Sequence, residues 1–156
     1  MKLWPFVLTS TAMILAFAGS AARAVTRKEF TPRDLQHLQT LKPEVRAHFE
    51  TLLRKAYEID PRARIDSSRR TVAEQDALYA QGRTKPGTII TNAHSCYSWH
   101  VQGRAIDIGG VPEDKLRLLA VWWKSIGGKW GGDFDGLDDP VHFEFHPGMR
   151  IEDECK

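Results

Sequence analysis

Two histidines and two aspartates stand in two separate groups whose composition suits a divalent metal ion. His100 offers an imidazole nitrogen, Asp107 a carboxylate seven residues later, and His142 a second imidazole. These are ligand types that zinc takes from proteins, and three protein ligands leave a fourth position for water, as in catalytic zinc sites. Asp139, three residues before His142, would place a carboxylate beside that water as a base.

The chain between His100 and Asp107 must turn for both side chains to reach one ion. On one straight strand, an odd spacing would put the two side chains on opposite faces. Gly103 permits a turn, and residues 104–108 alternate well enough to form a short strand that Gly109 ends. We therefore expect a turn followed by a strand at this motif.

These residues resemble the signature of a peptidase family. Ser98-x-His100-x-x-Gly103-x-Ala105-x-Asp107, followed by Asp139-x-x-His142, is similar to the motifs of zinc D-alanyl-D-alanine peptidases and L-alanyl-D-glutamate endopeptidases. The family includes phage endolysins, whose group this chain resembles most, the vancomycin-resistance dipeptidases and, by fold, the Hedgehog signalling domain. The resemblance runs from about Arg64 to Phe145 and implies one zinc ion per chain.

A further element of the family pattern precedes the metal motif. Arg70-Thr71-x-x-x-Gln75-x-x-Leu78-Tyr79 is similar to the family's Arg-Ser/Thr-x-x-x-Gln-x-x-Leu-Tyr element. There the arginine is held to stabilise the oxyanion of the tetrahedral intermediate, so the resemblance implies this role for Arg70. The family often has an aromatic residue where this chain has Arg69, which leaves open which arginine points inward.

The resemblance implies hydrolysis of an amide bond in peptidoglycan stem peptides. Its endopeptidases tend to carry Asp three residues before the last histidine, where its carboxypeptidases carry Glu, so Asp139 favours the L-alanyl-D-glutamate bond. We expect Ser98, Gln75 and Trp130 to contact the substrate. A D-alanyl-D-alanine carboxypeptidase and a non-catalytic zinc-containing cell-wall binding module are the alternatives. A binding module needs neither a base nor an oxyanion donor, so Asp139 and Arg70 argue against it.

The first 24 residues have the pattern of a secretory signal. Lys2 precedes an apolar run, and Ala22-Arg23-Ala24 forms a cleavage site before Val25. The run falls short of the roughly 20 apolar residues that span a bilayer, which argues against a retained anchor. We expect a single peptidase domain at residues 25–156, exported to the periplasm or the extracellular space as a monomer without a membrane span.

Length and charge fit a small globular enzyme. The chain has 156 residues, of which 42% are hydrophobic and 27% charged, enough for one core. Its formal net charge of +2 comes from 22 basic and 20 acidic residues, and the signal holds two of the basic residues, Lys2 and Arg23, and no acid. The expected mature chain is therefore neutral, and no basic surface for nucleic acid is implied.

Two cysteines, Cys96 and Cys155, suit a disulfide in an exported chain. In the chain-entropy model, closing a loop of this length stabilises the fold by about 4 kcal/mol. Cys96 as a zinc ligand or nucleophile is the alternative, against which the complete set of three ligands argues. His94 as a fourth ligand would close the position left for water, so we expect it in a loop or beside a ligand.

The resemblance implies an α+β fold with a small central antiparallel sheet that carries the zinc site and is flanked by helices. Residue patterns predict helices at 31–41, 43–59, 71–81 and 112–127, and strands at 63–68, 104–108 and 141–146. Leu35, Leu38 and Leu41 should form the apolar stripe of the first helix. A long connection at 82–97 should contain a short extended piece at 88–91.

The last expected strand alternates between two faces. His142, Glu144 and His146 should share the site's face, while Val141, Phe143 and Phe145 share the core's face. Two interpretations of Glu144 stay open, an acceptor that orients a ligand histidine and a surface carboxylate. We expect His146 at the rim of the site.

Overall fold

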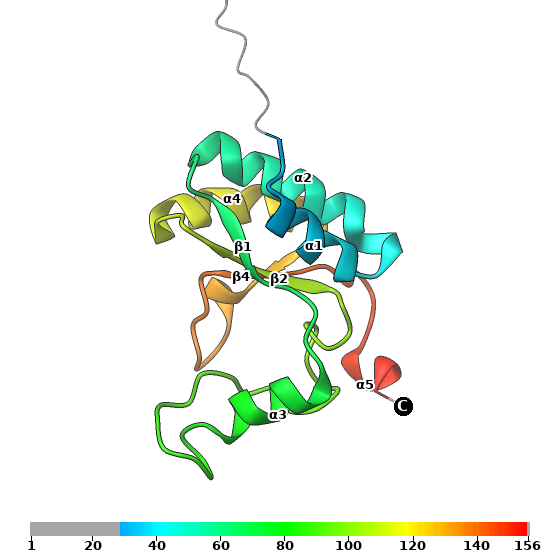
Figure 1. The fold of residues 1–156 in the computed structure, drawn as a ribbon, viewed down its shortest axis with the longest axis vertical. Coiled ribbons are helices and arrows are strands. Elements are labelled where there is room, and N and C mark those ends of the chain that lie inside the picture. Colours follow the sequence, from blue (N-terminus) through cyan, green and yellow to red (C-terminus); the bar gives the residue numbers. More distant parts are fainter. Residues whose placement is uncertain (1–28, 156) are drawn as a thin grey trace, which may run out of the picture.

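The computed structural model describes residues 29–155 (Figure 1), and the signal expected at residues 1–24 lies outside this range. The described elements follow one another as α1 (Pro32–Thr40), α2 (Pro43–Ile59), β1 (Arg64–Ser67), α3 (Val72–Ala80), β2 (Ala105–Gly109), α4 (Glu113–Ser125), β3 (Lys129–Trp130), a 3-10 turn (Gly131–Asp133), β4 (His142–Glu144) and α5 (Ile151–Glu154). The expected α+β class with a small antiparallel sheet is confirmed.

The sheet has the strand order β1-β2-β4-β3, and every neighbouring pair is antiparallel. The central strand β2 pairs with β4 so that Asp107 stands opposite His142. Because side chains of paired residues point to the same face of a sheet, this register brings the two residues together. Two segments that are distant in the sequence therefore meet in the middle of the sheet.

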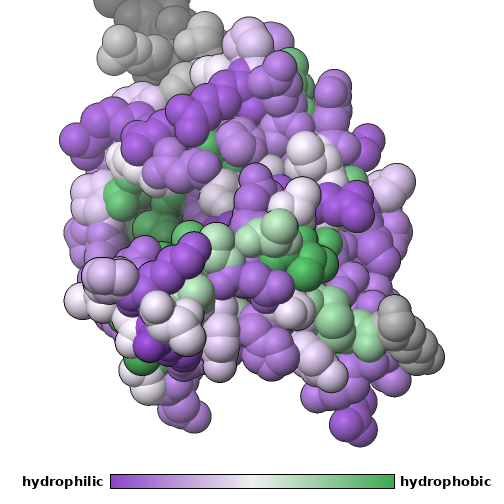
Figure 2. All heavy atoms as spheres, turned by 60° about the horizontal axis from the view of Figure 1, so that its bottom comes forward, coloured by the Kyte–Doolittle hydropathy of each residue, from purple (hydrophilic) through white to green (hydrophobic). Residues whose placement is uncertain are grey.

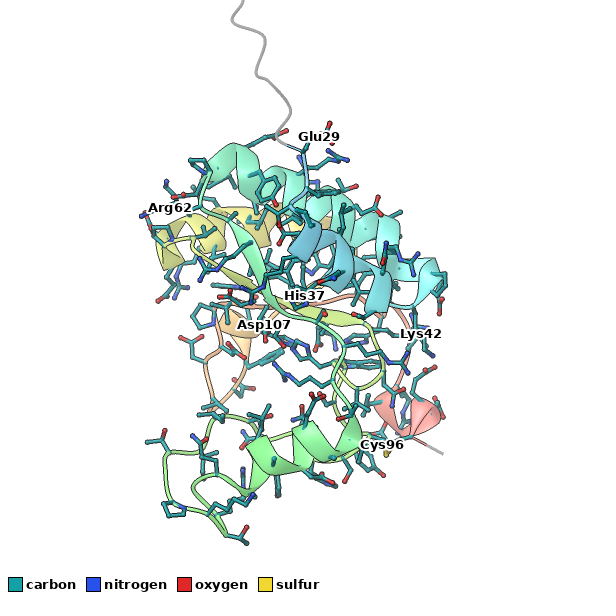
Figure 3. All side chains as sticks on the ribbon, in the orientation of Figure 1. Glu29, His37, Lys42, Arg62, Cys96 and Asp107 are labelled. Carbon is teal, nitrogen blue, oxygen red and sulfur yellow. A yellow bond between two sulfur atoms is a disulfide. The ribbon has the colours of Figure 1, made fainter. Side chains whose placement is uncertain are left out.

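One face of the sheet is covered by α1, α2 and α4 (Figure 1). Ile106, Ile108 and Phe143 are fully buried on this face, where they join Phe49 and Trp123 from the helices. Alternation along β2 and β4 then directs their polar residues to the opposite face. Figure 3 shows Asp107 on that second side, toward α3.

α3 and the long connection after it lie on the side of the second face (Figure 1). Thr71 and Glu74 form the predicted capping box at the start of α3. The amide of Gln75 donates to the carbonyl oxygen of Ala93 over 2.8 Å, which ties the connection to the helix. The extended piece expected at 88–91 pairs with no strand. Figure 2 shows that this side of the molecule is mostly hydrophilic, with apolar residues in small separate patches.

The apolar stripe predicted for α1 is partly wrong. Leu38 and Leu41 are buried, but Leu35 is 44% exposed and Asp34 is fully buried. The carboxylate of Asp34 accepts hydrogen bonds from the backbone N–H of Ile65, at 2.8 Å, and from the hydroxyl of Tyr57. These donors lie on β1 and α2, so long-range contacts, and not the apolar periodicity, set the rotation of this helix.

The last strand is shorter than expected. β4 ends at Glu144, and Val141 lies outside it and is 38% exposed, so Val141 does not join the core. Phe143 and Phe145 are buried as predicted. Beyond this strand the chain continues to α5 (Figure 1).

A disulfide between Cys96 and Cys155 closes the chain on itself, as expected, with 5.2 Å between the two Cα atoms. Lys42 also binds Glu154 of α5 through a 2.9 Å ion pair. In Figure 3, α5 lies between the labelled Lys42 and Cys96. No helix within residues 29–155 is long and apolar enough to cross a bilayer.

Candidate metal centre

Three side chains converge on the second face of the sheet. His100 Nε2 lies 3.1 Å from Asp107 Oδ1 and 3.0 Å from His142 Nδ1, and His142 Nδ1 lies 3.3 Å from Asp107 Oδ1. All three residues are buried. Two imidazole nitrogens and one carboxylate oxygen, within 4.8 Å of one another, form a donor set of the kind that holds zinc.

The local sequence explains this convergence. Asp107 and His142 are opposite each other on β2 and β4. His100 reaches them through the expected turn, in which the Gly103 N–H donates to the His100 carbonyl over 3.0 Å. Gly103 has a φ of +66°, a backbone conformation that glycine adopts without the steric cost of a Cβ.

Hydrogen bonds fix which nitrogen of each histidine is free. His100 Nδ1 lies 2.7 Å from the carbonyl oxygen of Ser68, which can only accept, so Nδ1 donates and Nε2 keeps its lone pair. His142 Nε2 lies 3.0 Å from the Glu144 carboxylate, so Nε2 donates and Nδ1 is the nitrogen left for a metal ion. Both of these nitrogens face Asp107, so the orientations of the two rings suit a metal ion.

Hydrogen bonds from histidines favour the ionised forms of the two carboxylates at the site, Asp107 and Glu144. Burial raises the pKa of Asp107, but hydrogen bonds from His100 and His142 outweigh it and hold the pKa well below its usual range. Burial likewise opposes ionisation of Glu144, whose bonds to His142 and His146 lower its pKa to about 2. For His142, burial is outweighed by bonds to the two carboxylates, which raise its pKa to about 9, so a metal ion that binds Nδ1 would displace a proton from it. Burial lowers the pKa of His100.

Arg70 is the inward-pointing arginine. Its Nη2 donates to Asp107 Oδ2 over 2.7 Å and to Ser67 Oγ over 2.8 Å, whereas Arg69 is exposed. Arg70 Nη1 also donates to Gln75 Oε1 over 3.3 Å. The structure thus resolves the ambiguity that the sequence left between the two arginines.

Gln75 and Ser98 lie behind this arginine. Gln75 is fully buried, and its Oε1 accepts from Ser98 Oγ over 3.1 Å as well as from Arg70. Ser98 borders the pocket at the site, whereas Gln75 does not. Gln75 therefore orients Arg70 and the loop after α3. It was expected to contact the substrate, but it does not line the pocket.

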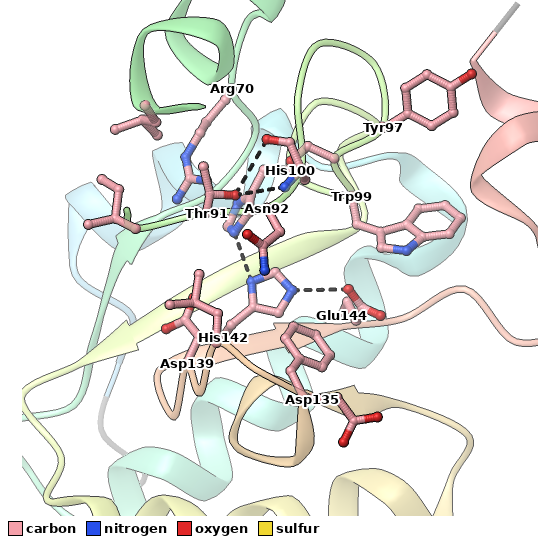
Figure 4. Close-up of a pocket in the computed structure, with 16 residues that line it drawn as sticks. Arg70, Thr91, Asn92, Tyr97, Trp99, His100, Asp135, Asp139, His142 and Glu144 are labelled. Carbon is pink, nitrogen blue, oxygen red and sulfur yellow. Dashed lines mark hydrogen bonds and ion pairs between the residues drawn. The ribbon is translucent and has the colours of Figure 1, made fainter. Parts of the chain in front are cut away.

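A pocket of about 510 Å³ opens beside the three ligands (Figure 4). Its lining consists of Arg70, Leu78, Ile90, Thr91, Asn92, Ala93, Tyr97, Ser98, Trp99, His100, Phe134, Asp135, Leu137, Asp139, His142 and Glu144. Asp139 belongs to this lining and Asp138 does not. Burial and then the charge of Asp107 raise the pKa of the Asp139 carboxyl.

Two expectations for individual residues are wrong in the structure. Trp130 is only 3% exposed, does not line the pocket, and donates its indole N–H to the Pro140 carbonyl over 2.7 Å. His146 is 5% exposed and not at the rim, because its ring stacks on Trp99 at a centroid distance of 3.8 Å. Neither long-range contact has a signal in the local sequence.

His94 lies in the loop and does not line the pocket; it is exposed, with its ring 5.3 Å from that of Tyr79 and 5.1 Å from that of Tyr97. Three residues of the pocket lining had no predicted role. Tyr97, Thr91 and Asn92 contribute a wall that the sequence indicated only as a long connection before the metal motif. Trp99 also lines the pocket, and the sequence signal for this was its position directly before the ligand His100.

Comparison with known proteins agrees with this geometry. The chain is 29% identical over 160 residues to the peptidoglycan L-alanyl-D-glutamate endopeptidase CwlK of Bacillus subtilis (strain 168), an alignment covering 91% of this chain and 95% of the relative. Its fold is similar to that of the L-Ala D-Glu endopeptidase ChiX of Serratia marcescens, with a TM-score of 0.51 and 19% identity over 80% of this chain and 94% of that one.

A second solved structure is more distant. The vancomycin-resistance D,D-pentapeptidase VanY in complex with Zn(II) gives a TM-score of 0.47 and 18% identity, over 74% of this chain and 84% of that one. The model of the VanY family, described as D-alanyl-D-alanine carboxypeptidase, matches residues 38–132, which include Arg70, His100 and Asp107. The matched segment is more than half of the chain, and the protein therefore belongs to the VanY family of D-alanyl-D-alanine carboxypeptidases.

Proposed function

We propose that this protein is a zinc peptidase that hydrolyses the L-alanyl-D-glutamate bond of peptidoglycan stem peptides. The observation that carries the proposal is the meeting of His100, Asp107 and His142 beside a pocket that also contains Arg70 and Asp139. Membership of the VanY family supports a cell-wall peptidase. The names of CwlK and ChiX, both L-alanyl-D-glutamate endopeptidases, support the choice of bond.

The three ligands would hold one zinc ion through His100 Nε2, His142 Nδ1 and Asp107. At sites with three protein ligands, zinc acts as a Lewis acid and lowers the pKa of water to about 7. Asp107 is fixed by Arg70, and each histidine is fixed through its other nitrogen. The chain thus presents its ligand atoms already oriented, which reduces the reorganisation that binding requires.

Asp139 is the proposed general base. It lines the pocket on the same side as His142, and its burial raises the pKa of its carboxyl, which makes it a stronger proton acceptor once ionised. It would take the proton of the attacking water and return it to the leaving amine. Asp135 also lines the pocket but is exposed to solvent.

Arg70 is the proposed oxyanion donor. Its guanidinium lines the pocket while Asp107, Ser67 and Gln75 hold it in place. A donor fixed before the reaction stabilises negative charge on the carbonyl oxygen without reorganising, and removing one such donor from a hydrolase costs roughly 3 to 4 kcal/mol.

The location of the protein is part of the proposal. We propose that residues 1–24 direct export and that residues 25–156 act outside the cytoplasmic membrane as a single monomeric domain. The Cys96–Cys155 disulfide supports this location, because disulfides persist in oxidising compartments. Peptidoglycan lies in the same compartment.

Digestion of purified peptidoglycan by the zinc-loaded protein tests this function. Mass analysis should find glycan that ends in L-alanine together with peptides that begin with D-glutamate. Release of free D-alanine would instead support the D,D-carboxypeptidase that the family description names. No product from either bond would contradict both enzymes and favour a zinc-containing binding module.

A further inference from the structure

A chain of buried contacts continues from His142 away from the metal ligands. Glu144 accepts from His142 Nε2 through Oε2, at 3.0 Å, and from His146 Nε2 through Oε1, at 2.7 Å. The His146 ring then stacks on Trp99, with 3.8 Å between centroids and 12° between planes. Trp99 directly precedes the ligand His100, so these contacts link the two segments that carry the metal ligands.

We propose that His146 is a positioning residue of the metal site, acting through Glu144 on the orientation of His142. The inference rests on the zinc site of the proposed function but not on its substrate. Both oxygens of Glu144 are used: one takes the N–H of His142 and the other takes the N–H of His146. The carboxylate therefore has one orientation in which both bonds are made.

Loss of His146 would leave the Glu144 carboxylate free to change its orientation. Glu144 borders the pocket but is only 5% exposed, so an oxygen that lost its donor would be poorly hydrated and would cost free energy. The carboxylate would rotate to recover a partner and would weaken its bond to His142 Nε2. His142 would then no longer be held in the orientation that directs Nδ1 at His100 and Asp107.

The other nitrogen of His146 supports a role for Nε2 alone. Within residues 29–155, the buried Nδ1 of His146 has no hydrogen-bond partner. The unpaired Nδ1 costs free energy of folding, whereas Nε2 of the same ring makes the bond to Glu144. The stack on Trp99 fixes the plane of the ring in which this single bond is possible.

His48 offers a matched control. Its ring stacks on Phe145, the neighbour of His146, with 4.1 Å between centroids, and its Nδ1 is likewise buried without a partner in the described part of the chain. It makes no hydrogen bond to the metal-site residues in that part. Removal of His48, a half-buried residue, therefore reproduces the loss of a stacked imidazole with a buried Nδ1 without the loss of the bond to Glu144.

The test measures zinc affinity by competition with a chromogenic chelator at constant pH. His146→Ala should raise the zinc dissociation constant by about 10- to 100-fold, the range seen when groups that orient metal ligands are lost. His146→Gln, whose amide can donate in place of Nε2, should recover most of the affinity. His48→Ala should stay within a few-fold of the unmodified protein.

Three outcomes would overturn the proposal: unchanged affinity in His146→Ala, no rescue by His146→Gln, or an equal loss in His48→Ala. Should His146→Ala fail to fold, Glu144→Gln keeps the size of the side chain, and its weaker acceptor should also raise the dissociation constant. Tight zinc binding without cleavage of peptidoglycan would contradict the proposed function and leave the role of His146 intact. An active protein whose affinity is unaffected by these variants would contradict only the role of His146.

Discussion

Arg70 and Asp107 form an ion pair in which Nη2 lies 2.7 Å from Oδ2, while Oδ1 of the same carboxylate faces His100 and His142. The arginine therefore determines which oxygen of Asp107 is available to a metal. Because Arg70 also lines the pocket, one side chain connects the orientation of a ligand with the stabilisation of charge on the substrate. Binding of the metal and catalysis should be coupled through this residue.

Replacing Arg70 should affect both properties. Arg70→Ala removes the oxyanion donor and should lower kcat by about 100- to 1,000-fold. It also releases Asp107, so zinc should bind more weakly, as a titration of zinc content against chelator would show. Arg69→Ala is the control, because Arg69 is exposed and should change neither quantity. Full activity in Arg70→Ala would remove the arginine from the mechanism.

Asp139 should separate catalysis from metal binding. Asp139→Asn keeps the shape of the side chain but cannot accept the proton of water, so hydrolysis should be lost while zinc stays near one ion per chain. Metal analysis and peptidoglycan digestion of the same preparation would measure both. Asp138→Asn is the control, since Asp138 does not line the pocket. Loss of zinc from Asp139→Asn would show that Asp139 is a ligand.

Asp34 should make the stability of the fold depend on pH. Burial raises the pKa of its carboxyl, but hydrogen bonds from Ile65, Thr31 and Tyr57 outweigh it and lower the pKa below the unfolded value. Ionised Asp34 therefore stabilises the fold above the unfolded pKa of about 4, and this contribution disappears as pH falls through the lower folded pKa.

The variant Asp34→Ala tests this dependence. It removes the acceptor of the buried Ile65 N–H and should cost about 3 kcal/mol of unfolding free energy at neutral pH. Urea titrations of both proteins at several pH values should show the difference shrinking in acid. A difference that does not change with pH would mean that the charge of Asp34 contributes nothing to stability.

The parts of the site that the sequence predicted are those set by short-range geometry. The turn at Gly103, the strand that carries Asp107 and the capping box at Thr71 each depend on neighbouring residues alone. Alternation along β4 also placed His142 and Glu144 on one face. The pairing of β2 with β4 was not predicted, because nothing in either strand specifies its partner.

The parts that the sequence did not predict depend on distant contacts. Asp34 is buried because its acceptor oxygens meet donors from β1 and α2, which no periodicity within α1 can reveal. His146 is buried because Trp99 covers it, although the two lie 47 positions apart in the chain. Trp130 was expected at the substrate, yet its indole N–H binds the Pro140 carbonyl within the protein.

The disulfide should stabilise both the fold and one wall of the pocket. It joins Cys155 to Cys96, and the next three residues, Tyr97, Ser98 and Trp99, line the pocket before the ligand His100. Cys155→Ser should lower the unfolding free energy by about 4 kcal/mol in the chain-entropy model. It should also raise KM more than it lowers kcat, because the wall loses its tether while the metal ligands keep theirs.

A reductant gives the matching experiment. Treatment with a phosphine that does not bind zinc should bring the unmodified protein to the stability and KM of Cys155→Ser, and should leave the variant itself unchanged. Cys96→Ser should behave as Cys155→Ser does, because either change removes the same bond. If Cys96→Ser alone also lost zinc, Cys96 would have to be a ligand, an arrangement at odds with the bond between its sulfur and that of Cys155.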